Sequence, residues 1–185
     1  MYPGKWAKEF PDKAAVLDSI SGATTTYRQL NERSNQLAQL MWTKGLRPGG
    51  HVAIFMENNL RYFEVIWAAL RSGLYLTTVN QYLTDEEAGY IVDNCGAEVL
   101  IASKRLGEVA SKLKAFAPNC HTWLMVDGVV DGYNAYEDAI ASYPTDKLAA
   151  EPAGLFMLYS SGTTGRPKGI LRPLPQCNIA DNPGA

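Results

Sequence analysis

The sequence predicts an α/β domain built on a mainly parallel sheet with helices on both faces. Short apolar runs alternate along the chain with longer segments of helical periodicity. These runs are apolar on both sides, which is typical of parallel strands that helices cover on both faces. A length of 185 residues fits one domain. We expect this domain to cover residues 1–171 and an irregular, proline-rich tail to cover residues 172–185.

The first part of the chain predicts a strand and a long helix. The run "AAVLDS" indicates the strand, and "SGA" indicates a turn after it. Thr26 and Gln29 then form a capping box, in which each side chain accepts the other residue's backbone N–H. Apolar residues recur at helical spacing beyond it, and Gly45 suits the left-handed conformation that ends many helices. We therefore expect a helix over residues 27–44.

Strands and helices continue to alternate along the rest of the chain. The run "HVAIFM" predicts a buried strand, and "ENNLRYFEVIWAALRSG" predicts a helix that asparagines cap and Gly73 ends. Three more strands are expected at "LYLTTV", "EVLIAS" and "HTWLMV". The tetrapeptide "TDEE" is a second capping box, and it begins a helix that ends near Asn94. Further helices are expected over residues 106–116 and, capped by Asn134, over residues 134–141.

Composition excludes several classes of protein. With 17 basic and 19 acidic side chains the net charge is -2, and no basic cluster indicates a nucleic-acid partner. The N-terminal residues form no long apolar stretch, so we expect a cytoplasmic protein without a transmembrane segment. Cys95, Cys120 and Cys177 are widely spaced, which predicts reduced thiols and no metal site. His51 and His121 stand singly in apolar surroundings and are interpreted as structural.

A stretch of hydroxyls, glycines and one lysine overlaps the end of the last predicted strand. That strand is "AGLFMLYSS", and the stretch is "YSSGTTGRPKG". In open α/β sheets, loops at the carboxyl ends of strands bind ligands. The spacing is not that of a P-loop, because Arg166 and Pro167 separate Gly165 from Lys168. Four hydroxyls, backbone amides and an ammonium group still match a polyphosphate, although the composition alone also fits a flexible linker.

The same stretch resembles the signature of a known family. "YSSGTTGRPKG" is similar to the phosphate loop of the adenylate-forming superfamily, which includes acyl-CoA synthetases, aryl-CoA ligases, luciferases and the adenylation domains of peptide synthetases. "TTTYRQLNERSNQLAQLMWTKGLRPGGHVAIFMENN" and "WAALRSGLYLTTVNQYLTDEEAGYIVDNCGAEVLIA" resemble the N-terminal region of that family. The resemblance extends as far as Ile170, and it implies part of the large N-terminal domain of an adenylate-forming enzyme.

The resemblance implies an AMP-forming acid–thiol ligase. Such enzymes use ATP and Mg²⁺ to convert a carboxylate into an acyl-adenylate and pyrophosphate, and most then transfer the acyl group to coenzyme A. An acyl-CoA synthetase for a fatty acid or a related carboxylate is our first choice. The loop offers neither a nucleophile nor a general base. The residues implied to contact the β- and γ-phosphates are Ser160, Ser161, Gly162, Thr163, Thr164, Gly165 and Lys168.

The chain departs from the family pattern in two ways. Family members are several times longer and carry adenine, ribose and magnesium sites beyond the loop. Many also continue with a Thr-His element, where this chain reads "ILRPLPQCN". We therefore expect an N-terminal fragment without a complete active site, whose partner is the missing remainder of its own polypeptide. Two alternatives stay open, a stand-alone nucleotide- or phosphate-binding module and a non-catalytic remnant of the fold; the intact loop counts against the second.

Overall fold

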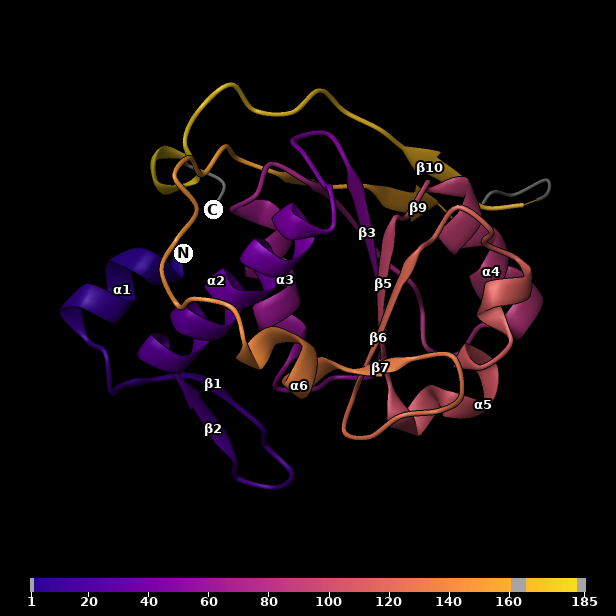
Figure 1. The fold of residues 1–185 in the computed structure, drawn as a ribbon, viewed down its shortest axis with the longest axis horizontal. Helices are drawn as coiled ribbons and strands as arrows, with labels where there is room; N and C mark the ends of the chain where they lie inside the picture. The colour runs from indigo at the N-terminus through magenta and orange to yellow at the C-terminus, as the bar shows by residue number, and fades with distance from the viewer. Residues whose placement is uncertain (1, 161–165, 183–185) are drawn as a thin grey trace.

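Six strands form one parallel sheet at the centre of the molecule (Figure 1). The structure, a computed structural model, describes residues 2–160 and 166–182. The strand order is β7-β6-β5-β3-β4-β8, and every neighbouring pair is parallel. This arrangement confirms the predicted fold class. The strands are β3 (His51–Phe55), β4 (Tyr75–Thr78), β5 (Val99–Ser103), β6 (Thr122–Val126), β7 (Asn134–Ala135) and β8 (Leu155–Phe156).

Helices cover both faces of this sheet. Figure 1 shows α2 and α3 on one side of it and α4 and α5 on the other. Side chains alternate along β3, so Val52 and Ile54 pack toward α2, α3 and α6, whereas Ala53 and Phe55 pack toward α4 and α5. The helices are α1 (Pro3–Glu9), α2 (Tyr27–Thr43), α3 (Tyr62–Leu70), α4 (Asp85–Asn94), α5 (Gly107–Ala110) and α6 (Tyr136–Ala141), with short 3₁₀ helices η1 (Lys104–Leu106), η2 (Leu113–Ala115) and η3 (Ile179–Asp181).

Both predicted capping boxes are confirmed. The backbone N–H of Gln29 donates to Oγ1 of Thr26 at 3.2 Å, and the backbone N–H of Thr26 donates to Oε1 of Gln29 at 2.9 Å. Thr84 and Glu87 make the same reciprocal pair at the start of α4. Gly73, with φ of 70°, adopts the left-handed conformation expected after α3. Local signals that involve residues three or four apart were therefore sufficient to place these helix ends.

The helix predicted over residues 106–116 is wrong. The chain forms α5 and two 3₁₀ turns there instead, because its hydrogen bonds switch to closer partners. Lys112 N–H donates to the carbonyl of Val109 at 3.0 Å, and Phe116 N–H donates to that of Leu113 at 3.0 Å, both three residues back. Glycine, serine and a β-branched valine lower the helix propensity of this stretch.

Two predicted helix caps are also wrong. Asn134 lies in β7 and pairs with Leu124 of β6, so α6 begins after Ala135 without a side-chain cap. The N-cap of α3 is Arg61, which makes no side-chain cap bond. Asn59 nevertheless accepts the backbone N–H of Arg61 at 2.9 Å through its side-chain oxygen. At Asn134, pairing with β6 replaces the local capping hydrogen bond that the sequence predicts.

The last predicted strand divides into two. β8 joins the parallel sheet, and the backbone N–H of Met157 donates to Leu76 at 2.9 Å. β9 (Leu158–Ser160) then leaves the sheet and pairs antiparallel with β10 (Lys168–Ile170). A second hairpin, β1 (Ala14–Leu17) and β2 (Thr24–Thr26), lies at the other end of the molecule (Figure 1). The chain therefore enters the candidate loop through a hairpin and not directly from the sheet.

The segment after β10 runs back across the molecule toward the N-terminal end (Figure 1). Ile179 is buried in a small cluster with Leu30 and Trp67. Its backbone N–H donates to the carbonyl of Glu151 at 2.9 Å, and Cys177 accepts the N–H of Ala153 at 3.0 Å. The domain boundary near residue 171 stays a prediction.

Candidate active site

The β9–β10 hairpin brings two predicted site residues together. Lys168 pairs directly with Ser160, and Ile170 pairs with Leu158. All four side chains are exposed, and the alternation along each strand places them on one face. The hydroxyl of Ser160 and the ammonium group of Lys168 therefore share a surface, although seven residues separate them in the sequence. The other predicted members, Ser161, Gly162, Thr163, Thr164 and Gly165, lie outside the described residues.

The opposite face of the hairpin turns inward. Tyr159 and Gly169 pair with each other on this face, and Tyr159 packs against the core cluster that includes Met157. A Cβ atom on Gly169 would lie 3.0 Å from Cζ of Tyr159 and closer still to Cε of Met157. Only a residue without a side chain fits here without displacing its neighbours. The final glycine of the sequence motif thus lets the side chains of Tyr159 and Met157 lie directly against β10.

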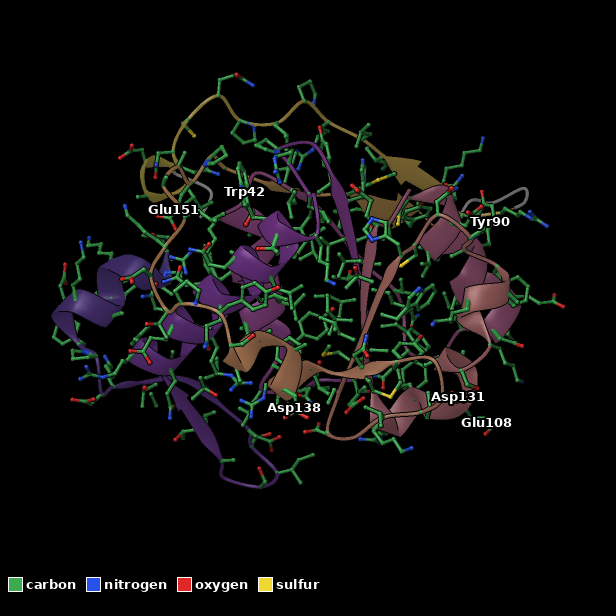
Figure 2. All side chains as sticks on the ribbon, viewed as in Figure 1. Trp42, Tyr90, Glu108, Asp131, Asp138 and Glu151 are labelled. Carbon is green, nitrogen blue, oxygen red and sulfur yellow. The ribbon has the colours of Figure 1, made fainter. Side chains whose placement is uncertain are left out.

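Side chains from α4 contact β9 and the two residues that precede β10. The hydroxyl of Tyr159 donates to Oδ1 of Asn94 at 2.7 Å. The hydroxyl of Tyr90 donates to the carbonyl of Pro167 at 3.3 Å, and the guanidinium group of Arg166 lies 4.9 Å from the centre of the Tyr90 ring. In Figure 2, Tyr90 is labelled beside the end of the hairpin. Tyr159 stands within the motif, but no sequence pattern indicated that α4 would supply its partners.

Lys168 carries the charge on the outer face of the hairpin. None of the ion pairs within residues 2–160 and 166–182 involves Lys168. Burial raises the pKa of Tyr159, and the nearby Cys95 and Tyr90 raise it further. The phenol therefore stays protonated and serves as a hydrogen-bond donor at neutral pH. A hydroxyl and an uncompensated cation on one exposed face can bind an anion such as phosphate.

A second group of polar side chains lies where β3, β5 and β6 end. Ser103 donates to Oε2 of Glu57 at 2.5 Å, and Asn59 donates to Oδ2 of Asp127 at 2.7 Å. These residues join the loops that follow three neighbouring strands. Sequence reasoning interpreted Asn59 as a helix cap or turn former and did not single out Glu57, Ser103 or Asp127, because each is an ordinary polar residue at or after the end of a strand. Among the residues that the structure describes, no group of three histidine, cysteine or acidic side chains could hold a metal ion.

A cavity of about 1240 Å³ lies between α1, α2 and the C-terminal segment, away from the hairpin. Polar side chains that line this cavity form hydrogen bonds with one another. Arg71 donates to Glu151 at 2.7 Å and to Asn31 at 3.0 Å, and Tyr2 donates to Glu151 at 2.6 Å. Figure 2 labels Glu151 on this side of the molecule. We interpret the group as structural, because its charges satisfy one another.

The fold belongs to the class of open α/β sheets, in which loops at the carboxyl ends of the strands bind ligands. The family model described as "AMP-binding enzyme" matches residues 4–175, nearly the whole chain. The chain therefore belongs to the AMP-binding enzyme family, and the resemblance inferred from the loop is confirmed.

Individual relatives agree with this assignment. The chain is 32% identical over 165 residues to a fatty acid–[acyl-carrier-protein] ligase, ScoC of Streptomyces coeruleorubidus, covering 89% of this chain and 31% of that protein. It is 27% identical over 164 residues to the long-chain-fatty-acid–CoA ligase FadD13 of Mycobacterium tuberculosis, covering 87% and 32%. The chain thus spans about a third of the length of these relatives.

Solved structures agree as well. The anthranilate CoA ligase AuaEII, solved in complex with anthranoyl-AMP, matches with a TM-score of 0.80 and 25% identity over 91% of this chain and 34% of that one. The N-terminal domain of FACL13 from Mycobacterium tuberculosis matches with a TM-score of 0.79 and 24% identity over 92% and 43%, which shows the shared fold. Among the helices of the described ranges, none is long and apolar enough to cross a membrane.

Proposed function

We propose that this chain supplies the phosphate-binding part of an AMP-forming acid–thiol ligase. The enzyme would activate a fatty acid or a related carboxylate with ATP and transfer the acyl group from the acyl-adenylate to coenzyme A. The observation that carries the proposal is the pairing of Ser160 with Lys168 on the exposed face of a hairpin, in a chain of the AMP-binding family. The names of the relatives, which include fatty-acid ligases, favour this substrate class.

Lys168 would bind the β- and γ-phosphates of ATP and stabilise the charge that develops as pyrophosphate leaves. A cation aimed at the position where charge develops lowers the barrier, because it favours the transition state over the ground state. The hydroxyl of Ser160 would donate a hydrogen bond to the same phosphates. We propose the same binding role for the remaining loop members, Ser161, Gly162, Thr163, Thr164 and Gly165.

Magnesium fits this arrangement as a companion of ATP. When bound with ATP, Mg²⁺ would neutralise part of the phosphate charge, and it commonly takes few ligands from the protein. Ser160 and Lys168 would themselves bind the phosphate oxygens. Lys168 is suited to this role because it is exposed and forms no ion pair within the described part of the chain.

The experiment is carboxylate-dependent exchange of labelled pyrophosphate into ATP. The panel contains short, medium, long and aromatic acids, each with ATP and Mg²⁺. It is run with the 185-residue chain and, if the reading frame continues, with the longer product. We expect exchange with one class of acid, most of it lost in Lys168→Ala. Lys44→Ala is the matched control, since it removes another exposed lysine at the end of α2.

The outcomes separate the remaining hypotheses. Exchange by the longer product alone would support our prediction that the isolated chain lacks a complete active site. ATP binding by the chain without exchange in either product would favour a nucleotide-binding module. Neither binding nor exchange in a folded protein would indicate a non-catalytic remnant and would overturn the proposal. The cytoplasmic location stays a prediction that cell fractionation can check.

A further inference from the structure

We propose that α4 positions the phosphate-binding hairpin and that Tyr159, Asn94 and Tyr90 are its positioning residues. The inference rests on the proposed function, because it assigns the side chains that hold Ser160 and Lys168 in place for phosphate. None of the three would touch the nucleotide. They would act through the geometry of the two strands.

The hairpin needs such support because its own contacts are few. β9 and β10 share three residue pairs, and two-stranded hairpins are marginally stable in water at best. Residues of β4 hold both ends of the hairpin: Met157 N–H donates to the carbonyl of Leu76 at 2.9 Å, and the hydroxyl of Tyr75 donates to the carbonyl of Arg172 at 2.7 Å. Between these ends the outer face is exposed, with Leu158 and Ile170 each 53% accessible. Within the hairpin itself, further support therefore comes from the inner face, which lies toward α4.

Tyr159 joins three segments at once. Its backbone belongs to β9, its ring lies against Gly169 of β10, and its hydroxyl donates to Asn94 at the end of α4 at 2.7 Å. Because Gly169 has no side chain, the ring can cross beneath the neighbouring strand. Ser160 directly follows Tyr159, and Lys168 directly precedes Gly169. A fixed ring therefore fixes the backbone from which both phosphate-binding side chains extend.

Tyr90 makes the second attachment one helical turn earlier. It lies four residues before Asn94, and residues at this spacing share one face of a helix. Its hydroxyl donates to the carbonyl of Pro167 at 3.3 Å, and its ring faces the guanidinium group of Arg166 at 4.9 Å. Pro167 directly precedes Lys168. One face of α4 thus holds the strand on each side of residues 161–165.

The test is a double-mutant cycle on pyrophosphate exchange, in whichever product shows it. Tyr159→Phe removes only the hydroxyl that contacts Asn94, and we expect kcat to fall about tenfold, since small misplacements of a binding group are costly. The KM for ATP should change less than kcat. In a Lys168→Ala background the same substitution should have little further effect, because positioning residues act through Lys168.

Two further variants separate positioning from general stability. Asn94→Asp keeps an acceptor oxygen and should retain most of the activity, whereas Asn94→Leu should behave like Tyr159→Phe. Tyr133→Phe is the matched control, because it removes a tyrosine hydroxyl that donates to Ala110 at 2.9 Å on the same side of the sheet. It should leave kcat unchanged. A wild-type rate in Tyr159→Phe, or fully additive effects in the cycle, would overturn the inference and leave the proposed function intact.

Amide hydrogen exchange keeps the inference testable if no pyrophosphate exchange is found with any acid. That result would count against the proposed function alone. In Tyr159→Phe the amides of β9 and β10 should then exchange about tenfold faster than in the wild type, because a loosened hairpin opens more often. Tyr133→Phe should leave them unchanged. Equal protection in wild type and Tyr159→Phe would show that α4 does not hold the hairpin.

Discussion

The central sheet and the β9–β10 hairpin are held in place in different ways. Strands β3 and β5 are hydrogen-bonded on both sides and buried on both faces, so apolar packing fixes them. The hairpin has one exposed face, and its other face combines the packing of Tyr159 on the core with a few polar contacts to α4. Substitutions in the sheet and its supports should therefore lower stability, whereas substitutions in the hairpin should lower activity first.

The largest expected loss of stability follows from breaking the buried ion pair between Arg71 and Glu151, which lies just before β8 in the chain. Arg71 and Glu151 form an ion pair at 2.7 Å, and their side chains are only 1% and 2% exposed. Arg71→Ala leaves the carboxylate buried without its main partner, which should cost about 3–5 kcal/mol of unfolding free energy. Urea denaturation measures this loss. Arg28→Ala is the control, because its pair with Asp12 is exposed and should contribute less than about 1 kcal/mol.

Equal losses in the two arginine variants would contradict the comparison. They would mean that burial of the ion pair contributes nothing beyond an exposed contact. A loss confined to Arg71→Ala would instead show that the buried ion pair before β8 contributes to the stability of the whole domain, as the packing of the sheet does.

Two glycines provide the second test. A Cβ on Gly154 would clash with the backbone carbonyl oxygen of Leu74. It would also lie 2.9 Å from the backbone nitrogen of Leu74 and 3.0 Å from the carbonyl oxygen of Ala69. Backbone atoms within a sheet and helix cannot move aside, so Gly154→Ala should cost about 1–3 kcal/mol or more. Thermal or urea unfolding measures the loss of stability.

Gly169→Ala should lower activity more than stability, the reverse of what we expect for Gly154→Ala. Its added Cβ would meet Cε of Met157, the end of a flexible side chain, and the ring of Tyr159. Because these groups can shift, the stability loss should stay below about 1 kcal/mol. Moving Tyr159 should still lower the rate of pyrophosphate exchange about tenfold. A stability loss in Gly169→Ala as large as that in Gly154→Ala would break the comparison.

The contrast also explains how much of the fold was predictable. The capping box of Thr26 and Gln29 and the apolar strands were recognised because their signals are local or periodic. The helix over residues 106–116 was not, because hydrogen bonds to closer partners compete with regular helical bonds in a segment of weak helix propensity. Sheet pairing at Asn134 likewise replaced the expected cap.

The motif indicates which residues belong to the candidate site, a prediction that stays open, but it does not indicate their geometry. The motif identified Ser160 and Lys168, but not that they pair across two strands. The hairpin also contacts Tyr90 and Asn94, which lie more than 60 residues away in the sequence. Long-range contacts of this kind leave no periodic pattern, so single-sequence reasoning could not place them.

The helix caps provide a third, smaller test. Thr84→Ala and Thr26→Ala each remove the side chain of a capping box, and each should cost about 1 kcal/mol. The first variant weakens α4, which holds the hairpin, and the second weakens α2, which covers the sheet. Only Thr84→Ala should speed hydrogen exchange in β9 and β10. If both variants speed exchange in β9 and β10 equally, the opening of the hairpin follows global stability and does not depend on α4.

The smallest expected effect concerns His51, at the start of β3. Its ring stacks on Tyr75 with 4.9 Å between centroids, and its buried Nδ1 has no hydrogen-bond partner among the residues that the structure describes. Burial lowers the pKa of His51, and Glu98 offsets part of that change. The folded protein therefore binds fewer protons here than the unfolded chain, whose histidine titrates near pH 6.5. The stability from neutral His51 is complete above that pH and is lost as the pH falls through the folded-state pKa.

His51→Phe keeps an aromatic ring against Tyr75 but cannot take up a proton. Between pH 7 and pH 5 the wild type should lose more stability than this variant, as measured by urea midpoints at both pH values. The carboxylates are the same in both proteins, so their titration cancels in the difference. Identical pH dependence would mean that the imidazole of His51 is solvated in the folded state. A steeper loss in the wild type would show that burial of His51 in the sheet opposes its protonation. In the hairpin, by contrast, hydrogen-bond partners hold the polar residues in place.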